Sequence, residues 1–257
     1  MLVRTDDLVR LNQRFAGAAP EAVLRFVHET FGPRAALLSS MQRAGLALAH
    51  VANEAGLSFD LLFVDTGVLH PQTLQARDEL SLTHPRLRIR TLTPARTFLE
   101  QTQAEGLLYL TPEGQARCCD LRKSAPLHGE RGKYDALVAA LRRGEGGKRS
   151  KVETFALDPE MQALRVHPLA HVADDWLDAY TRTHATVIEN TLHRMGFPTI
   201  GCYTCTTPVR EDEDERAGRW RHLDGVRYCG INPGEGELGA PPEVELADSY
   251  RGALGAT

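Results

Sequence analysis

Apolar and polar residues follow two different periods along the first half of the chain. Some segments repeat apolar side chains every three to four residues, as one face of a helix does, and others are short apolar or alternating runs typical of strands. The expected helices cover residues 21–31, 42–55 and 71–80. The expected strands cover residues 35–38, 59–64 and 87–92. Residues 135–141 suit a further buried strand, although their alanines suit a helix as well.

Strands separated by helices of this length predict an α/β fold with a doubly wound, mainly parallel sheet. In such a sheet, ligands bind in the crevice at the carboxyl ends of the strands. The loops expected there carry hydroxyl groups, backbone amides and paired guanidinium groups, which are suited to a phosphorylated ligand. These loops are Ser39-Ser40, Asp65-Thr66-Gly67 and Arg142-Arg143.

The end of the chain has a different composition. Residues 234–257 are rich in Gly and Pro, contain several acidic residues and have few large apolar side chains. Such a segment buries too little apolar surface to offset the entropy of ordering it. We therefore expect a single α/β domain over residues 1–233 and a disordered tail over residues 234–257.

The overall composition is that of a soluble globular protein, with 42% hydrophobic and 25% charged residues. The net charge of −4 provides no general basic field, so neither nucleic acid nor a membrane surface is an expected partner. The N-terminal residues do not resemble a signal peptide, and no apolar run is long enough to span a bilayer. The expected location is the cytoplasm, where thiols stay reduced.

The five cysteines are the strongest chemical signal in the sequence. Cys118 and Cys119 are adjacent, Cys202 and Cys205 form a C-x-x-C pair, and Cys229 stands alone. Two close pairs of thiols can hold one metal centre, which leaves one cysteine over. Adjacent cysteines would strain a zinc site because their side chains diverge, whereas separate irons of an iron–sulfur cluster can each take one thiolate. Spacing alone leaves open a cluster, a zinc ion or buried cysteines without a ligand.

The charged side chains near these cysteines suggest an anion site. Cys229 follows a charged, turn-rich stretch, where it fits equally a buried inert thiol or a nucleophile whose pKa a nearby cation lowers. Arg216 and Arg219 are three residues apart, so in a helix they would share a face and could clamp phosphate or sulfate. Each charge taken alone also fits an ordinary solvated surface. Further positive charge from other loops would come from Lys123, Arg142 and Arg143.

Several segments occur in an order that resembles a known family. They are Cys118-Cys119-Asp-Leu-Arg-Lys123, Gly201-Cys202-Tyr-Thr-Cys205, Glu215-Arg216-Ala-Gly218-Arg219-Trp220 and Cys229-Gly230. Upstream, Ser39-Ser40 falls at the family's phosphate-binding turn, and Asp65-Thr66-Gly67 looks like its Asp-Thr-Gly segment. Over residues 20–232 the chain resembles the assimilatory adenylyl-sulfate reductases, the iron–sulfur branch of the phosphoadenylyl-sulfate reductase family.

This resemblance implies an adenine nucleotide α-hydrolase-like fold with a C-terminal cysteine-bearing segment and a role in sulfate assimilation. It implies a [4Fe-4S] cluster with the ligands Cys118, Cys119, Cys202 and Cys205. Adenosine 5′-phosphosulfate would be attacked by Cys229 to give AMP and an S-sulfocysteine, from which thioredoxin or glutaredoxin would release sulfite. The implied substrate-binding residues are Ser39, Ser40, Lys123, Arg142, Arg143, Arg216 and Arg219.

Some positions depart from the family's pattern. They are Arg43, Ala140, Gly146, Thr207 and Asn232. Because these departures lie on the substrate side, reduction of the 3′-phosphorylated substrate is an alternative. A tRNA-thiolating enzyme of the same fold is disfavoured, since residues 39–45 lack Ser-Gly-Gly-x-Asp-Ser and the charge is not basic. An alternative from another class is a non-catalytic iron–sulfur or nucleotide-binding sensor, which would have little need for Cys229. The sequence leaves open whether the chain forms a homo-oligomer.

Overall fold

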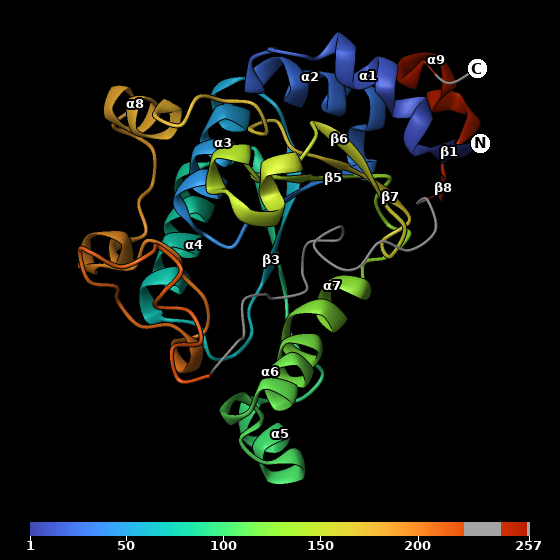
Figure 1. The fold of residues 1–257 in the computed structure, drawn as a ribbon. Helices are drawn as coiled ribbons and strands as arrows, with labels where there is room; N and C mark the ends of the chain where they lie inside the picture. The colour runs from blue at the N-terminus through green and yellow to red at the C-terminus, as the bar shows by residue number, and fades with distance from the viewer. Residues whose placement is uncertain (224–242, 256–257) are drawn as a thin grey trace.

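A computed structural model describes residues 1–223 and 243–255 of the chain. Its largest element is a six-stranded sheet with the strand order β4-β3-β2-β5-β7-β6 (Figure 1). Neighbouring strands run parallel, except that β6 runs antiparallel to β7. The strands of this sheet are β2 (Ala35–Leu38), β3 (Phe59–Val64), β4 (Leu87–Leu92), β5 (Ala136–Ala139), β6 (Phe155–Asp158) and β7 (Ala163–Val166). The predicted doubly wound, mainly parallel α/β sheet is confirmed.

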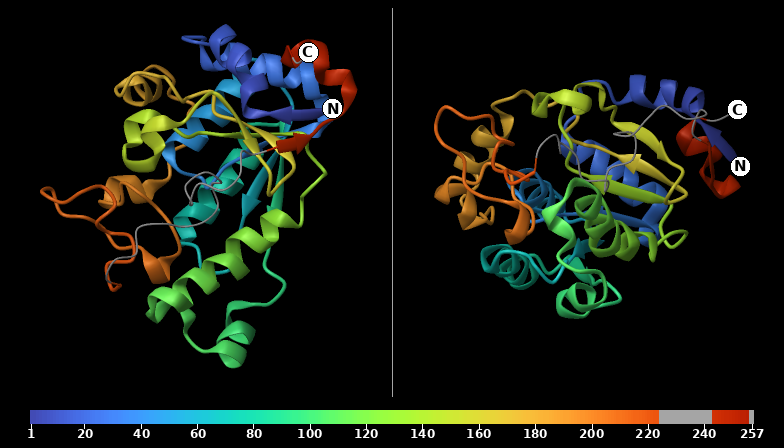
Figure 2. Two further views of the ribbon diagram at one scale, coloured as in Figure 1. Left: turned by 45° about the vertical axis from the view of Figure 1, so that its right-hand side comes forward. Right: turned by 60° about the horizontal axis from the view of Figure 1, so that its bottom comes forward.

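Helices lie on both faces of this sheet (Figure 2). The helices of the described residues, including those outside the two faces, are α1 (Val9–Arg14), α2 (Pro20–Phe31), α3 (Arg43–Glu54), α4 (Pro71–Thr83), α5 (Phe98–Glu105), α6 (Pro112–Cys119), α7 (Ala125–His128), α8 (Trp176–Thr183) and α9 (Arg251–Leu254). The three helices and three strands expected within residues 21–92 all form, and the ambiguous segment 135–141 contributes a strand. Within the described residues, no helix is long and apolar enough to cross a membrane.

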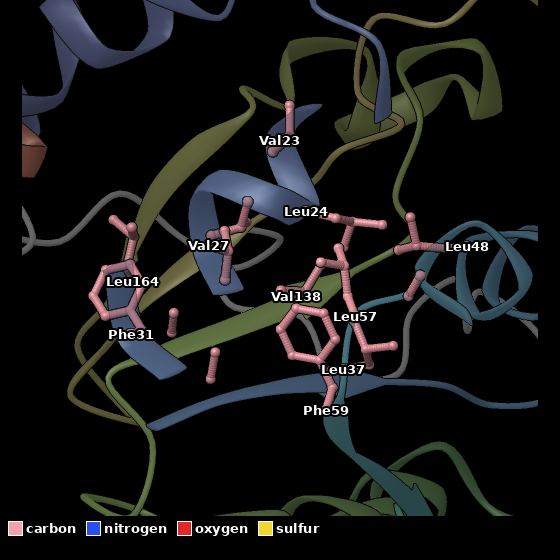
Figure 3. Packing of buried hydrophobic residues seen from close by; sticks show 14 of the residues in the cluster. Val23, Leu24, Val27, Phe31, Leu37, Leu48, Leu57, Phe59, Val138 and Leu164 are labelled. Carbon is pink, nitrogen blue, oxygen red and sulfur yellow. The ribbon is translucent and has the colours of Figure 1, made fainter. Parts of the chain in front are cut away.

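Successive residues of the central strands face two different apolar layers. In β2, Ala35 and Leu37 belong to the larger layer, whereas Ala36 belongs to the smaller one. This alternation follows from the two-residue period of a strand. The larger layer packs beneath α2 and α3 (Figure 3), and the smaller layer receives Leu127 of α7. Both faces of the sheet are therefore covered, which explains why its central strands are apolar throughout.

Helix α2 shows how local sequence and packing agree. Pro20 occupies the first turn, where its missing N–H leaves no hydrogen bond unmade, and Gly32 ends the helix with φ of +50°. The helix buries one apolar face against the sheet, formed by Val23, Leu24, Val27 and Phe31. Truncating one of these side chains, as in Leu24→Ala, is expected to destabilise the fold by about 2–5 kcal/mol.

The connection between β4 and β5 forms an arm that projects from the sheet (Figures 1 and 2). It contains α5, α6 and α7, and α6 continues into α7 through a π-helical turn, Asp120–Ser124. Such turns widen a helix by one residue and are frequent at functional sites. The adjacent Cys118 and Cys119 are the last two residues of α6, directly before this turn.

The two ends of the described chain lie together (Figure 1). Strand β1 (Leu2–Arg4) pairs with β8 (Glu243–Glu245), and Tyr250 donates a hydrogen bond to Asp135 Oδ2 at 2.8 Å. Of the tail expected to be disordered over residues 234–257, residues 234–242 and 256–257 lie outside the described residues, whereas residues 243–255 are folded. Their composition is polar, but Val244, Leu246 and Leu254 are buried in the larger apolar layer.

Candidate functional site

The two cysteine pairs line one cavity, although they lie far apart in the sequence. Cys118 and Cys119 come from the end of α6, and Cys202 and Cys205 come from the segment after residue 200. The other residues around the cavity are Val68, Gln115, Arg122, Lys123, Thr204 and Trp220. The structure therefore brings together the four cysteines expected to act as ligands, with Lys123 beside them. Cys229 and Asn232 lie outside the described residues.

Helix α6 begins at an N-cap that fixes its position in the arm. The Thr111 hydroxyl accepts a hydrogen bond from the backbone N–H of Gly114 at 3.1 Å. Gly114 also allows a close approach, since a Cβ atom there would lie 2.2 Å from the carbonyl oxygen of Leu108. Consecutive residues on a helix point about 100° apart, so Cys118 and Cys119 face different directions. A group bound by both must therefore offer two separate attachment points.

The second pair lies on a 3₁₀ turn, Tyr203–Cys205, in which the N–H of Cys205 donates to the carbonyl of Cys202 at 3.0 Å. The N–H of Tyr203 donates to the carbonyl of Val68 at 2.9 Å, which ties this turn to the loop after β3. The loop after β3 and the C-x-x-C turn thus support each other. Both cysteines of this pair are buried.

Each of the four thiols lies near a different polar side chain. The atom pairs are Gln101 Nε2 to Cys118 Sγ at 3.7 Å, Gln115 Nε2 to Cys119 Sγ at 3.0 Å, Thr66 Oγ1 to Cys202 Sγ at 3.3 Å, and Thr204 Oγ1 to Cys205 Sγ at 3.6 Å. Burial raises the pKa of Cys118 and of Cys205. Lys123 acts in the opposite direction on both thiols, because a cation favours a thiolate.

Arg122 is a buried cation between the two cysteine pairs. Its guanidinium donates to the carbonyl of Thr66 at 2.6 Å and to Gln101 Oε1 at 3.0 Å. Burial lowers the pKa of Arg122, and the nearby Cys118 and Cys202 raise it. A buried guanidinium is favourable only where anions or hydrogen-bond acceptors surround it. Arg122 is satisfied by these acceptors and adds a buried positive charge to the cavity that the cysteines line.

The four cysteines are not placed as the ligands of a single ion. Ligands that share one tetrahedral zinc ion lie about 3.8 Å apart, because each Zn–S bond is about 2.3 Å long. No group of three or more His, Cys, Asp or Glu side chains within residues 1–223 and 243–255 is placed to hold one metal ion.

A second part of the site lies where the chain changes direction across the sheet. After β2 the chain builds β3 and β4 on one side, and it then returns to form β5 on the other side of β2. Leu38 and Ala139 are register partners at the ends of these two neighbouring strands. Ser39-Ser40 and Arg142-Arg143 follow them, so the predicted loops meet at the point where α/β proteins bind ligands.

The turn after β2 is held by its own side chains. The Ser39 hydroxyl accepts a hydrogen bond from the N–H of Met41 at 3.1 Å, and the Ser40 hydroxyl accepts one from Gln42 Nε2 at 2.9 Å. Ser39 is buried, whereas Ser40 is exposed. Met41 has φ of +56°, an uncommon value for a residue other than glycine. The turn expected to bind phosphate thus contains a residue with an uncommon backbone conformation and is held by its own side-chain hydrogen bonds.

The paired arginines after β5 have different environments. Arg143 donates to the carbonyl of Val152 at 2.7 Å and to Glu153 Oε1 at 2.5 Å, so its guanidinium group is already paired with a carboxylate. Arg142 has a buried Nε atom without a hydrogen-bond partner among the described residues, and Glu145 Oε1 lies 3.7 Å away. Arg142 is therefore the better placed of the two to bind an anion.

Arg216 and Arg219 do not share a helix face, because residues 211–220 form turns and an isolated bridge between Thr206 and Arg219. Each guanidinium group nevertheless contacts the indole of Trp220, at 6.0 Å from its centroid for Arg216 and 4.5 Å for Arg219. A Cβ atom at Gly201 would lie 2.6 Å from Arg219 Nη2, so glycine makes room for this arginine. Trp220 also lines the cysteine cavity, which places both arginines near it.

The sequence did not identify the polar side chains that contact the thiols. Gln115 precedes Cys119 by four residues and Arg122 follows Cys118 by four, so helical spacing would have indicated both. Gln101 reaches Cys118 from another helix, and no local pattern predicts that contact.

The fold has counterparts among solved structures. A phosphoadenylyl-sulfate reductase from Candida auris matches with a TM-score of 0.68 and 20% identity, over 80% of this chain and 98% of that chain. An FMN adenylyltransferase from Candida glabrata matches with a TM-score of 0.52 and 12% identity, over 99% of this chain and 85% of that chain. These matches show that the chain shares its fold with α/β proteins of this kind, in agreement with the predicted fold class.

Sequence comparison defines the family more closely. Residues 34–208 match the phosphoadenosine phosphosulfate reductase domain. An adenosine 5′-phosphosulfate reductase from Streptomyces coelicolor is 34% identical, over 89% of this chain and 96% of that protein. One from Anoxybacillus flavithermus is 32% identical, over 82% of this chain and 88% of that protein. The chain belongs to the phosphoadenosine phosphosulfate reductase family.

Proposed function

We propose that this chain reduces adenosine 5′-phosphosulfate to sulfite and AMP, with thioredoxin or glutaredoxin as the electron donor. The observation that carries the proposal is the single cavity lined by both cysteine pairs. The similarity to proteins named adenosine 5′-phosphosulfate reductase supports the choice of substrate. The electron donor follows from the chemistry, since release of sulfite from a cysteine needs an external thiol.

The cofactor of this proposal is a [4Fe-4S] cluster held by Cys118, Cys119, Cys202 and Cys205. The donor set fits it, because all four thiols line one cavity and the adjacent pair diverges. The buried Arg122 fits as well, since its positive charge would offset negative charge on the cysteine thiolates. When bound, the cluster would join the two cysteine segments and supply electrostatic stabilisation near the sulfate.

The substrate would lie across the carboxyl ends of β2 and β5. Ser39 and Ser40 would bind the phosphate side, together with Arg142 and Arg143. The sulfate would lie toward the cysteine cavity, within reach of Lys123, Arg216 and Arg219. Arg219 has a buried Nε atom without a partner among the described contacts, which an anionic oxygen would satisfy.

The reaction would proceed in two steps through Cys229. Its thiolate would attack the sulfate sulfur, forming an S–S bond and breaking the S–O bond to the phosphate, so that AMP leaves with the electron pair. A thiolate of the electron donor would then attack Cys229 Sγ and release sulfite. This attack leaves a mixed disulfide between the donor and Cys229. The second thiol of the donor would then attack it, forming the donor's own disulfide and returning Cys229 to the thiol. The donor dithiol is oxidised to a disulfide as sulfate sulfur is reduced to sulfite.

Cys229 follows the described part of the site closely in the sequence. Trp220 lines the cavity, and the N–H of Leu223 donates to the Trp220 carbonyl at 2.8 Å. Cys229 follows Leu223 by six residues, and a chain of that length spans at most about 20 Å.

Intact-mass measurement tests this function. Incubation with adenosine 5′-phosphosulfate and no reductant is expected to add one SO₃ group to the wild type and none to Cys229→Ser. Added thioredoxin should then release sulfite from the wild type. Sulfite production by Cys229→Ser at the wild-type rate would show that another group is the nucleophile. Comparing kcat/KM with and without a 3′-phosphate on the substrate should favour the form without it.

A further inference from the structure

Two buried glutamines contact the adjacent cysteines, one each. Gln101 of α5 is 2% exposed and Gln115 of α6 is 3% exposed. Gln115 Nε2 lies 3.0 Å from Cys119 Sγ, and Gln101 Nε2 lies 3.7 Å from Cys118 Sγ. Glutamine is mostly an exposed residue, so burying two of them at one pair of thiols calls for a physical reason.

The orientation of the Gln101 amide is fixed by its neighbour. Arg122 Nη1 donates to Gln101 Oε1 at 3.0 Å, and a guanidinium group has no acceptor. The carbonyl end of the amide must therefore face Arg122, which leaves the NH₂ end toward Cys118. Arg122 is itself held by the carbonyl of Thr66 at 2.6 Å, so the donor to Cys118 is anchored to the loop after β3.

Gln115 reaches its cysteine along one helix. It lies four residues before Cys119, a spacing that places two side chains on the same face. Its backbone N–H donates to the carbonyl of Thr111 at 2.8 Å, within the first turn of the capped helix. The two glutamines thus approach the two diverging thiols from two different helices.

An N–H donor at a thiolate has two physical effects. It stabilises the negative charge of the sulfur, and it restricts the rotation of the cysteine side chain. In iron–sulfur proteins, hydrogen bonds to the sulfurs are among the factors that set cluster properties. If its donor were removed, a buried thiolate would keep its charge with less compensation.

We propose that Gln101 and Gln115 are positioning residues, which hold the thiolates of Cys118 and Cys119 in their divergent directions and reduce electron donation from these sulfurs to iron. This inference rests on the proposed function, because it requires Cys118 and Cys119 to be ligands of the cluster. Each glutamine acts on its own thiolate, so removal of both donors has a larger effect than removal of either one.

The test is resonance Raman spectroscopy of the anaerobically purified protein, with iron and sulfide content and circular dichroism on each sample. The variants are Gln101→Met, Gln115→Met and the double variant, since methionine has a similar length and no donor. Gln103→Met on α5 is the matched control, because Gln103 is exposed. Gln115→Glu is a second variant that keeps a polar side chain at that position.

The expected result is a shift of the Fe–S(Cys) stretching bands to higher wavenumber in the single variants and a larger shift in the double variant. Iron loss to a chelator should also become faster, by about 10- to 100-fold as for other residues that support metal ligands. Gln103→Met should match the wild type. If Gln101→Met, Gln115→Met and Gln115→Glu contain the cluster and show wild-type spectra and wild-type iron retention, this inference is overturned and the proposed function stands. A wild type without iron would overturn the proposed cofactor as well.

Discussion

The side-chain amide of Asn190 donates a hydrogen bond to the backbone carbonyl of Met41, at 3.1 Å. The same nitrogen donates to Thr73 Oγ1 at 3.1 Å, and Asn190 is fully buried. Met41 lies in the turn after β2 with φ of +56°, so the bond supports a strained residue. Asn190 also begins the segment that leads to the C-x-x-C turn, and it thus joins the turn after β2 to that segment.

Asn190→Ala is expected to lower both stability and substrate affinity. The substitution leaves the buried Met41 carbonyl without this donor, which destabilises by about 1–3 kcal/mol. The free energy of unfolding from urea titration and the KM for adenosine 5′-phosphosulfate check this. Asn53→Ala is the control, since its amide makes a 3.5 Å contact with Glu54. Unchanged stability and KM in Asn190→Ala would show that the turn does not depend on this bond.

Arg142 and Arg143 are expected to differ in their effect on substrate binding. Arg142 Nε has no hydrogen-bond partner among residues 1–223 and 243–255, whereas Arg143 is bonded to Val152 and Glu153. Losing one hydrogen bond to a charged group is worth about 1.5–3 kcal/mol, so Arg142→Met should raise KM by roughly 10- to 100-fold. Arg143→Met should raise it less and mainly lower the melting temperature. The reverse order of KM values would contradict this assignment.

Acid is expected to destabilise the protein through His167. Burial lowers the pKa of this imidazole from 6.5 to about 4. Between these values the unfolded state binds the additional proton, so stability is fully present above pH 6.5 and falls as the pH drops toward 4. The difference corresponds to on the order of 3 kcal/mol, at about 1.4 kcal/mol per pKa unit.

Urea titrations at pH 7 and pH 4.5 measure this dependence. His167→Gln should lose less stability than the wild type between the two pH values, because the group that takes up the proton is gone. An equal loss in both proteins would assign the acid sensitivity to other groups. Buried His84 and half-buried His193, whose pKa values burial also lowers, would then be the next to examine.

The C-terminal segment is expected to contribute to stability. Leu246 is buried in the same apolar layer as Val244, and the N-terminal amino group donates to its carbonyl. Leu246→Ala should lower the free energy of unfolding by about 2–5 kcal/mol. Leu2→Ala is the matched control, because Leu2 is 50% exposed. An equal, small effect of both substitutions would show that residues 243–255 are not docked in solution.

Much of the fold was predictable because local patterns agree with it. Short apolar runs predicted β2 and β3, and an apolar face repeating every three to four residues predicted α2. In each segment the local pattern favours the element that the structure shows. The paired cysteines were also predictable as one site, since their spacing and the family motifs agree. The C-terminal strand was not, because its partner β1 lies at the other end of the chain.

The details of the site depend on contacts that no local pattern encodes. Gln101 meets Cys118 because the arm folds α5 against α6. Arg216 and Arg219 both contact Trp220 from a segment of turns, whereas the sequence analysis had considered only the face that they would share in a helix. Long-range packing determines such contacts. The sequence therefore predicts which residue types form the site, but not which side chains contact each other there.

The iron and acid-labile sulfide content of anaerobically purified wild type tests the central claim most directly. If the four cysteines hold one [4Fe-4S] cluster, the protein is brown and contains about four irons and four sulfides per chain, with neither in Cys119→Ser. Colourless protein that holds one zinc ion per chain, or no metal, would contradict the account.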